Sequence, residues 1–211
     1  MIIKTKNRTP FNYTTHLARS WKDYVVYLKR FRNNPTPILD MGCGIGLFLE
    51  ACRMNNVNAI GVEFEIEGVQ LAINKGLRAS QHDLTQPLTF FQNETFGAVF
   101  SNQVIEHLTV NAQHNLVSEA YRVLKPGGQL LITSPCRYYK PASNDKYHIN
   151  LLTPSELRSL ALKYGFVKVS MGYNRCQEIK FIPKSIVTWL WKRYKPDFFS
   201  QDATILAYKP S

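Results

Sequence analysis

The sequence of 211 residues lacks the features that mark several classes of protein. No apolar run is long enough to cross a bilayer, and residues 1–12 are polar and basic, without the apolar core of a secretory signal. The four cysteines form neither a CxxC pair nor the spacing of a zinc site. These absences predict a cytoplasmic protein that keeps its thiols reduced and holds no metal.

The chain also has no internal repeat, no low-complexity tract and no glycine-serine linker. Its length and its hydrophobic content of 45% suit one sizeable core and are small for two. Segments with strand and helix patterns alternate, which is typical of a parallel sheet covered by helices. The sequence therefore predicts an α/β fold in a single domain over residues 1–211.

Acidic residues are scarce, and the net charge is +11. The excess of positive charge is +7 over residues 1–37 and +6 over residues 151–211, whereas residues 38–150 carry −2. Basic ends of this kind attract phosphates, acidic metabolites, nucleic acid or anionic lipid. Surface lysines that serve only solubility explain the same excess equally well.

Apolar periodicity and turn residues predict the order of the elements. The clearest helix starts after Thr153, where Thr153 is the N-cap, Pro154 takes the first helical position, Glu156 completes a capping box and Gly165 ends the helix. Further helices are expected over residues 15–32, 47–54, 65–75, 111–124 and 183–194. Strands are expected over residues 38–41, 57–62, 96–101, 129–133, 166–171 and 203–208, with a turn over 126–128.

The segment that carries the chemistry is the glycine turn after the first strand, with Gly42, Gly44 and Gly46 following Asp40. Glycines allow close approach of a ligand, and the next helix offers it N-terminal amides. A nicotinamide-binding fingerprint would place its third glycine where Leu47 stands. The acid before the turn also disfavours a pyrophosphate and suits a ligand with an ammonium group.

An acid followed by G-x-G-x-G resembles the first motif of class I S-adenosylmethionine (SAM)-dependent methyltransferases. The resemblance covers most of the chain and is poorest before Thr36 and over residues 176–201. Residues 61–63 resemble the second motif of the family, residues 81–84 the adenine-contacting segment, residues 96–108 the fourth-strand motif and residues 122–128 the turn before strand five. His148 with residues 152–157 is similar to the small-molecule and quinone methyltransferase subgroup.

The resemblance implies a three-layer Rossmann-like methyltransferase fold with a mostly parallel seven-stranded sheet whose last strand is antiparallel. Residues 1–36 would form an N-terminal helical cap, and residues 172–202 a basic, tryptophan-containing insertion. The implied cofactor is SAM, released as S-adenosylhomocysteine. The implied cofactor-binding residues are Asp40, Gly42, Cys43, Gly44, Gly46, Glu63, Phe64, Asp83, Leu84, Asn102 and Gln103.

Within this set, the resemblance assigns Glu63 to the ribose hydroxyls, Asp83 to the adenine edge and Phe64 to stacking on adenine. Asn102 and Gln103 would lie beside the transferred methyl group. Each residue also has a simpler interpretation: Glu63 as a surface acid, Asp83 as a turn cap, Phe64 as a core residue, and the amides as polar groups at a strand end.

Two histidines are candidate catalytic bases, His107 and His148, because histidine can accept a proton near neutral pH. Both could instead be structural hydrogen-bonding residues, and methyl transfer needs a base mainly when the acceptor is a hydroxyl. Cys136 follows a proline, as in some cytosine carbon-5 methyltransferases, but their other catalytic segments are absent. Cys136 is therefore interpreted as a buried or loop thiol.

The family's acceptor pocket is roofed by segments that correspond here to residues 1–32, 136–150 and 172–202. Since the first and third are basic, the leading hypothesis is transfer to an oxygen of a small-molecule acceptor that is anionic or lipid-linked. An RNA methyltransferase is the second hypothesis, because Tyr138, Tyr139 and Tyr147 lie in a basic loop, although no RNA-binding module is recognisable. A non-catalytic SAM-binding subunit is the third, and the intact motifs argue against it.

The last third of the chain allows one further contact. Trp189 and Trp191 stand beside Lys192 and Arg193, a combination that suits peripheral contact with a membrane. A dimer contact or a packed lid explains the same residues. The sequence leaves the oligomeric state undetermined.

Overall fold

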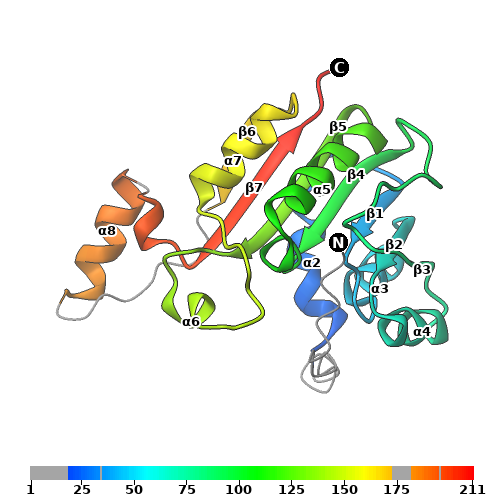
Figure 1. Ribbon diagram of the computed structural model, residues 1–211, viewed down its shortest axis with the longest axis horizontal. Helices are drawn as coiled ribbons and strands as arrows, with labels where there is room; N and C mark the ends of the chain where they lie inside the picture. Colours follow the sequence, from blue (N-terminus) through cyan, green and yellow to red (C-terminus); the bar gives the residue numbers. More distant parts are fainter. Residues whose placement is uncertain (1–18, 34, 173–181, 195) are drawn as a thin grey trace.

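The computed structural model describes residues 19–33, 35–172, 182–194 and 196–211. Its centre is one seven-stranded sheet with the order β3-β2-β1-β4-β5-β7-β6 (Figure 1). β7 runs antiparallel to both neighbours and the other pairs are parallel, which confirms the predicted sheet. The strands are β1 (Ile38–Met41), β2 (Ala59–Glu63), β3 (Ala79–Gln81), β4 (Phe96–Asn102), β5 (Leu124–Pro135), β6 (Val167–Gly172) and β7 (Asp202–Tyr208).

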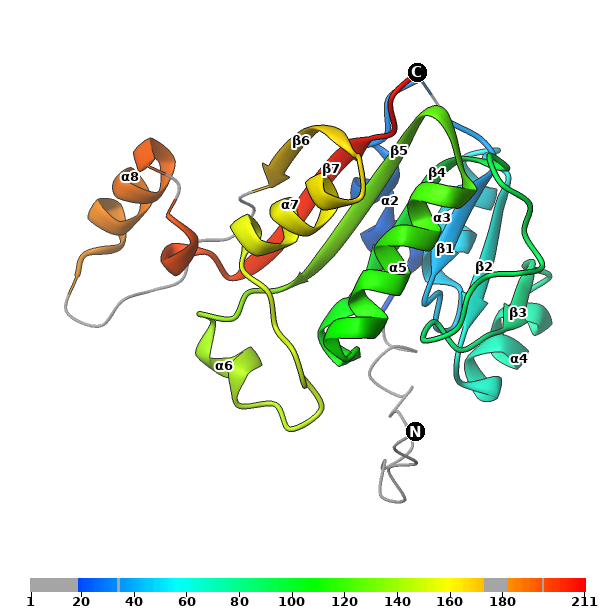
Figure 2. The ribbon, with the colours of Figure 1, turned by 45° about the horizontal axis from the view of Figure 1, so that its top comes forward.

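Helices cover both faces of the sheet, so the fold has the three predicted layers (Figure 2). α5 and α7 pack on one face through Leu116 and Leu157, and α3 packs on the other through Phe48. Among the described helices, none is both long and apolar enough to span a bilayer. The α-helices are α2 (Val25–Leu28), α3 (Leu47–Met54), α4 (Ile66–Asn74), α5 (Val110–Val123), α6 (Lys140–Ser143), α7 (Pro154–Lys163) and α8 (Lys184–Tyr194), and the 3-10 helices are η1 (Trp21–Tyr24), η2 (Ile105–His107) and η3 (Asp197–Phe199).

The prediction of a long first helix over residues 15–32 is wrong in its described part. The Ser20 hydroxyl accepts from a backbone N–H of the next turn while the Asp23 side chain accepts from the N–H of Ser20, so a capping box starts a short helical segment there. This segment, η1 followed by α2, ends at Leu28. Tyr27 then packs on Phe100 with ring centroids 5.3 Å apart, which holds this part of the predicted cap against the sheet.

Two other predictions need correction. Residues 126–128, expected as a turn, lie within β5, where Phe96 pairs with Leu124 and Ala98 already pairs with Gln129. The extra residues form a bulge, and the Gly127 N–H donates to the carbonyl of Lys209, so the backbone groups remain paired. The helix predicted over residues 183–194 is present as α8 from Lys184, and it buries Val187 and Trp191 but leaves Ile186 and Trp189 exposed.

The capping box of α7 is confirmed. The Thr153 hydroxyl accepts from the Glu156 N–H at 3.2 Å, and the Glu156 carboxylate accepts from the Thr153 N–H at 2.8 Å. Gly165 ends the helix with φ of +92°, a conformation that costs other residues about 1 kcal/mol. Local sequence signals therefore fix this helix at both ends.

Candidate cofactor and acceptor site

The site lies where the order of the strands reverses. β2 lies on one side of β1 and β4 on the other, while the chain continues from β4 to β5 in the opposite direction from β1 to β2. A crevice forms outside the carboxyl ends of parallel strands at such a reversal, and ligands of α/β proteins bind there. The glycine turn follows β1 at this edge, and Gln103 follows β4.

The glycine turn has two packed positions and one open position. A Cβ atom at Gly42 would collide with the Cγ2 atom of Val104, and the backbone there has φ of +86°. At Gly46, a Cβ atom would lie 2.6 Å from a methyl carbon of Leu77. A Cβ atom at Gly44 would meet no protein atom within 4 Å. Gly42 and Gly46 thus serve the packing of the turn, and the space beside Gly44 remains for a ligand.

Asp40 lies in β1 beneath the turn and is almost fully buried. Burial, and then the charge of Glu63, raise the pKa of Asp40 well above its ordinary value. Among the residues that the structure describes, none donates a hydrogen bond to its carboxylate. Tyr24 lies close enough to Asp40 for the charge of Asp40 to raise the pKa of Tyr24, although burial is the larger cause of that rise. A buried acid of this kind would be stabilised as a carboxylate by a cationic ligand, which fits the ammonium and sulfonium groups of SAM.

Glu63 ends β2 beside the turn. Its carboxylate accepts one hydrogen bond from the Gly44 N–H at 2.8 Å and another from the Glu65 N–H at 3.0 Å. A carboxylate has about four acceptor positions, so about two remain for neighbouring hydroxyl groups. The next residue, Phe64, is 47% exposed, so the alternative that it belongs to the core is wrong. Both side chains fit the roles that we propose for them toward ribose and adenine.

The segment predicted to contact adenine, residues 81–84, is only partly available to a ligand. Asp83 accepts from the Thr85 N–H at 2.9 Å, so it does cap a turn, as its simpler interpretation states. Leu84 is buried in the main core, and Cys43 is buried beneath the glycine turn against Gly61. The side chains of Leu84 and Cys43 therefore face the protein interior, and any contact of theirs with SAM would involve backbone atoms.

Asn102, the last residue of β4, and Gln103, which follows it, show features that are typical of a ligand site. The Oδ1 atom of Asn102 is buried and has no hydrogen-bond partner among the described residues. Gln103 has φ of +58°, although it is not glycine. A buried acceptor without a partner and a left-handed residue are both costly, and such features concentrate at ligand sites. We propose that Asn102 and Gln103 contact SAM near its methyl group.

The two candidate bases lie together. The ring centroids of His107 and His148 are 5.0 Å apart. The Nδ1 atom of His107 lies 2.9 Å from the carbonyl of Tyr147, and that of His148 lies 2.8 Å from the carbonyl of Ala142. Because a carbonyl only accepts, each Nδ1 donates, and each neutral ring keeps its acceptor at Nε2. This tautomer is the one that a base at Nε2 requires.

Sequence reasoning missed Glu106 as the third member of this cluster. Its side chain is fully buried, and neither carboxylate oxygen has a hydrogen-bond partner among the described residues. Burial raises the pKa of Glu106 to about 7, and one of its oxygens lies 3.9 Å from the Nε2 of His107. The Glu106 carbonyl also accepts from the N–H groups of Ile149 and Asn150, which brings the loop with His148 to η2. An isolated acid in the sequence gives no signal of this long-range contact.

One ligand atom from each of Glu106, His107 and His148 lies within 4.8 Å of the others. Carboxylate and imidazole groups accept a divalent cation as well as a proton. No metal was expected from the sequence, because the four cysteines lack the spacing of a zinc site. In contrast, Cys136 is buried and its pKa is raised to about 11, chiefly by burial, so its interpretation as an inert thiol fits the structure.

Comparison with known proteins identifies the family. Residues 13–171 match the model of a methyltransferase domain. The chain belongs to the methyltransferase domain family. A solved SAM-dependent methyltransferase from Archaeoglobus fulgidus has the same fold, with a TM-score of 0.74 and 20% identity over 96% of this chain and 100% of that one. The chain thus has the α/β fold of SAM-dependent methyltransferase domains.

The names of two curated relatives of this methyltransferase domain indicate different substrates. The mitochondrial ubiquinone biosynthesis O-methyltransferase of Rattus norvegicus is 33% identical over 46% of this chain and 30% of its own length. A probable tRNA methyltransferase 9B of Homo sapiens is 36% identical over 45% of this chain and 20% of its own length. The chain therefore spans less than a third of either relative, and neither name fixes its acceptor.

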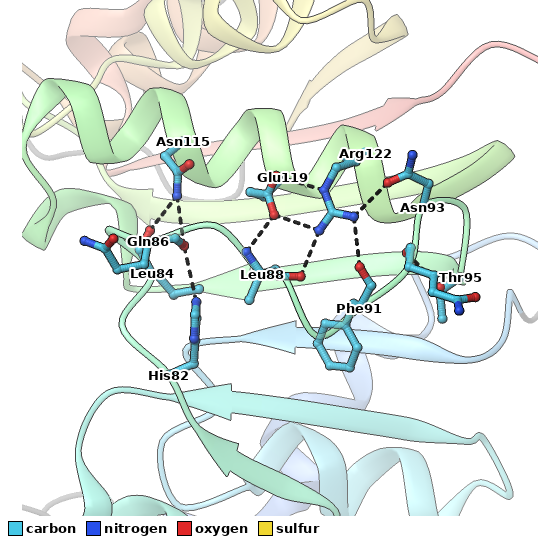
Figure 3. Close-up of polar contacts among 11 residues, drawn as sticks. His82, Leu84, Gln86, Leu88, Phe91, Asn93, Thr95, Asn115, Glu119 and Arg122 are labelled. Atoms are coloured by element: carbon cyan, nitrogen blue, oxygen red, sulfur yellow. Dashed lines mark hydrogen bonds and ion pairs between the residues drawn. The ribbon is translucent and has the colours of Figure 1, made fainter.

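Three side chains of α5 hold the segment that follows the residues predicted to contact adenine (Figure 3). The Nδ2 atom of Asn115 donates to the carbonyls of Leu84 and Gln86 at 3.1 Å each. Glu119 accepts from the Leu88 N–H at 2.7 Å and from Arg122 at 2.8 Å. Arg122 also donates to the carbonyls of Leu88 and Phe91 at 2.9 Å. The ion pair lowers the pKa of Glu119, and the network fixes the chain next to Asp83.

Two alanine substitutions in the glycine turn should have different effects on this methyltransferase, one chiefly on stability and the other chiefly on SAM binding. Gly42→Ala should lower the free energy of unfolding by about 3 kcal/mol, since it adds left-handed strain and a collision with Val104. Gly44→Ala should cost only about 1 kcal/mol but weaken SAM binding, because its methyl group enters the open space. Urea unfolding and calorimetric SAM titration measure the two quantities. Unchanged SAM affinity in Gly44→Ala would show that the cofactor does not use that space.

Proposed function

We propose that this protein methylates an oxygen atom of a small-molecule acceptor, with the His107–His148 pair accepting the proton. The observation that carries the proposal is the placement of both Nε2 acceptors and the buried Glu106 carboxyl at the end of β4. A hydroxyl is a weak nucleophile until its proton is removed, so a base matters for O-methylation. The relative named as a ubiquinone biosynthesis O-methyltransferase supports transfer to oxygen.

In this proposal the chain's residues bind SAM and leave its methyl group open to the acceptor. Asp40 faces the cationic part of the cofactor, Glu63 accepts from the ribose hydroxyls, and Phe64 and Asp83 contact adenine. When bound, SAM supplies a methyl group on a sulfonium, which is already an activated leaving group. A histidine Nε2 atom removes the proton of the acceptor hydroxyl, and the buried Glu106 carboxyl stabilises the protonated ring. Alignment of the acceptor within the crevice supplies much of the remaining rate.

The positive charge of the chain indicates which class of acceptor the protein uses. Both ends of the chain are basic in sequence, which favours an anionic or lipid-linked acceptor. RNA is the second candidate acceptor, and the relative named as a probable tRNA methyltransferase supports it. The side chain of Lys146 also lies 5.0 Å from the ring of Tyr147 in the loop after β5, a pairing that could stack with a base.

Labelling separates these acceptors. The pure protein is incubated with SAM carrying a radioactive methyl group and an extract of the source cells, which is then divided into organic-soluble, small aqueous, RNA and protein fractions. We expect label in the organic or small aqueous fraction, and none with the Glu63→Ala variant. Label in RNA would reverse the ranking of the two acceptors. Binding of SAM without label in any fraction would instead support a non-catalytic subunit.

A further inference from the structure

α8 exposes large apolar side chains on one side and buries others on the opposite side. Val187 and Trp191 are buried. At 100° per residue, Ile186, Trp189 and Arg193 lie on the other side of the helix, where Ile186 is 49% and Trp189 60% exposed. Figures 1 and 2 both show α8 standing away from the sheet. Ile186, Trp189, Lys192 and Arg193 are called the α8 surface below.

The sequence around α8 carries only positive charges. Between Glu178 and Asp197 the sequence contains five lysine or arginine residues and no acidic residue. Of these, Lys184, Lys192 and Arg193 belong to α8 itself. Arg193 lies 5.5 Å from the ring of Tyr194, so its cationic head stays beside an amphipathic aromatic ring. The α8 surface therefore combines apolar, aromatic and cationic groups without a negative charge.

These groups fit one kind of partner, an anionic membrane surface. Tryptophan and aliphatic side chains enter the boundary between headgroups and acyl chains, while lysine and arginine reach the lipid phosphates. In a symmetric dimer the same surface would meet itself, and its like charges would repel. RNA would pair with the cations but would leave Ile186 without an apolar partner. Charge complementarity and composition together favour lipid.

The topology places this surface at the same edge of the sheet as the site. α8 and η3 connect β6 to β7, and the first residue of β7, Asp202, pairs with Pro135 at the end of β5. The Asp197 side chain of η3 accepts from the Ser155 N–H at 3.2 Å, which ties η3 to the start of α7. Figure 1 shows α6 and α8 beyond the end where β5 stops and β7 begins. A membrane that contacts α8 thus approaches the edge at which the acceptor enters.

We propose that the α8 surface docks this protein on an anionic membrane. The docking itself does not depend on the acceptor. Its consequence, that the acceptor is a lipid-linked molecule taken from that membrane, rests on the proposed function.

Vesicle sedimentation tests the docking. The full-length protein is mixed with vesicles of phosphatidylcholine alone or of phosphatidylcholine with phosphatidylglycerol, at low and high salt. We expect binding only to the anionic vesicles, and weaker binding at high salt. Ile186→Asp and the double variant Lys192→Glu/Arg193→Glu should each lower the partition coefficient about tenfold or more, because each removes apolar insertion or reverses two cationic contacts.

Matched controls isolate the surface. Ile73 of α4 is 45% exposed, so Ile73→Asp makes the same chemical change on another helix. Arg158 and Lys163 are exposed on α7, so Arg158→Glu/Lys163→Glu gives the same change in net charge. Both controls should bind vesicles like the unaltered protein. Equal losses in controls and α8 variants, or no anionic-vesicle binding at all, would overturn the docking.

The oligomeric state and turnover complete the test. Light scattering after size exclusion should give the same mass for the unaltered protein and Ile186→Asp, and a dimer that dissociates in Ile186→Asp would overturn the proposal in favour of self-association. Vesicle binding by the His148→Ala variant should be unchanged. If the unaltered protein binds vesicles but no label enters the organic fraction, the lipid-linked acceptor is refuted and the docking on a membrane is retained.

Discussion

Glu63→Ala is expected to weaken SAM binding about 100-fold. The carboxylate is already oriented by the Gly44 and Glu65 N–H groups and has acceptor positions left for two hydroxyls. Two hydrogen bonds to a charged acceptor contribute together about 3 kcal/mol, which corresponds to that factor in affinity. The substitution also leaves the Gly44 N–H without its acceptor, so the turn itself becomes less well fixed. Calorimetric titration with SAM measures the dissociation constant directly.

Glu67→Ala is the control for this change. Glu67 lies in the first turn of α4, is exposed, and carries the same charge four residues further along the chain. The Glu67→Ala variant should bind SAM with the affinity of the unaltered protein and unfold at a similar urea concentration. If Glu63→Ala bound SAM normally, the end of β2 would have no part in the cofactor site.

His107→Ala and His148→Ala should each lower kcat about 100-fold or more while SAM affinity stays within about twofold, since a positioned base contributes about that factor. The two rings share one site with Glu106, so the double variant should be little slower than either single one. Initial rates of S-adenosylhomocysteine release with the acceptor recovered from the labelled fraction give kcat. Rates equal to that of the unaltered protein would assign both histidines to structure alone.

His114→Ala is the matched control, because His114 hydrogen-bonds to the Tyr164 hydroxyl at 2.9 Å on the surface between α5 and α7. Its kcat should be unchanged.

A chelator distinguishes a proton-accepting role of Glu106, His107 and His148 from a metal site at the same residues. If the histidines accept a proton, the enzyme keeps its rate after exhaustive dialysis against EDTA, whereas a bound cation would be removed and the rate restored by added metal. Loss of rate on dialysis would replace the proton-acceptor role by a metal site at Glu106, His107 and His148.

The ends of helices and strands were predicted accurately where capping or turn residues lie next to them in the sequence. α7 begins and ends where Thr153 and Gly165 indicate, because caps act within one helical turn. The first helix was predicted too long, since apolar spacing continued across Ser20 and Asp23 while their side chains capped the backbone there. The turn at residues 126–128 became part of β5 because the chain end, at Lys209, supplies the acceptor for Gly127. That partner lies far away in the sequence and gives no local signal.

The amino-acid sequence by itself determined the family, the order of every strand except β3 and of the helices except α6 and the 3-10 helices, and the cofactor-binding candidates on short segments at or after the ends of β1, β2 and β4. These follow from local patterns, since a strand, a glycine turn and an acid at a strand end are neighbours along the chain. The tertiary structure alone decided which side chains meet across the chain. It buried Glu106 beside His107 and brought His148 to them through backbone contacts with a distant loop. It also left Ile186 and Trp189 exposed on α8, because burial depends on how a helix packs and periodicity shows only that an apolar side exists.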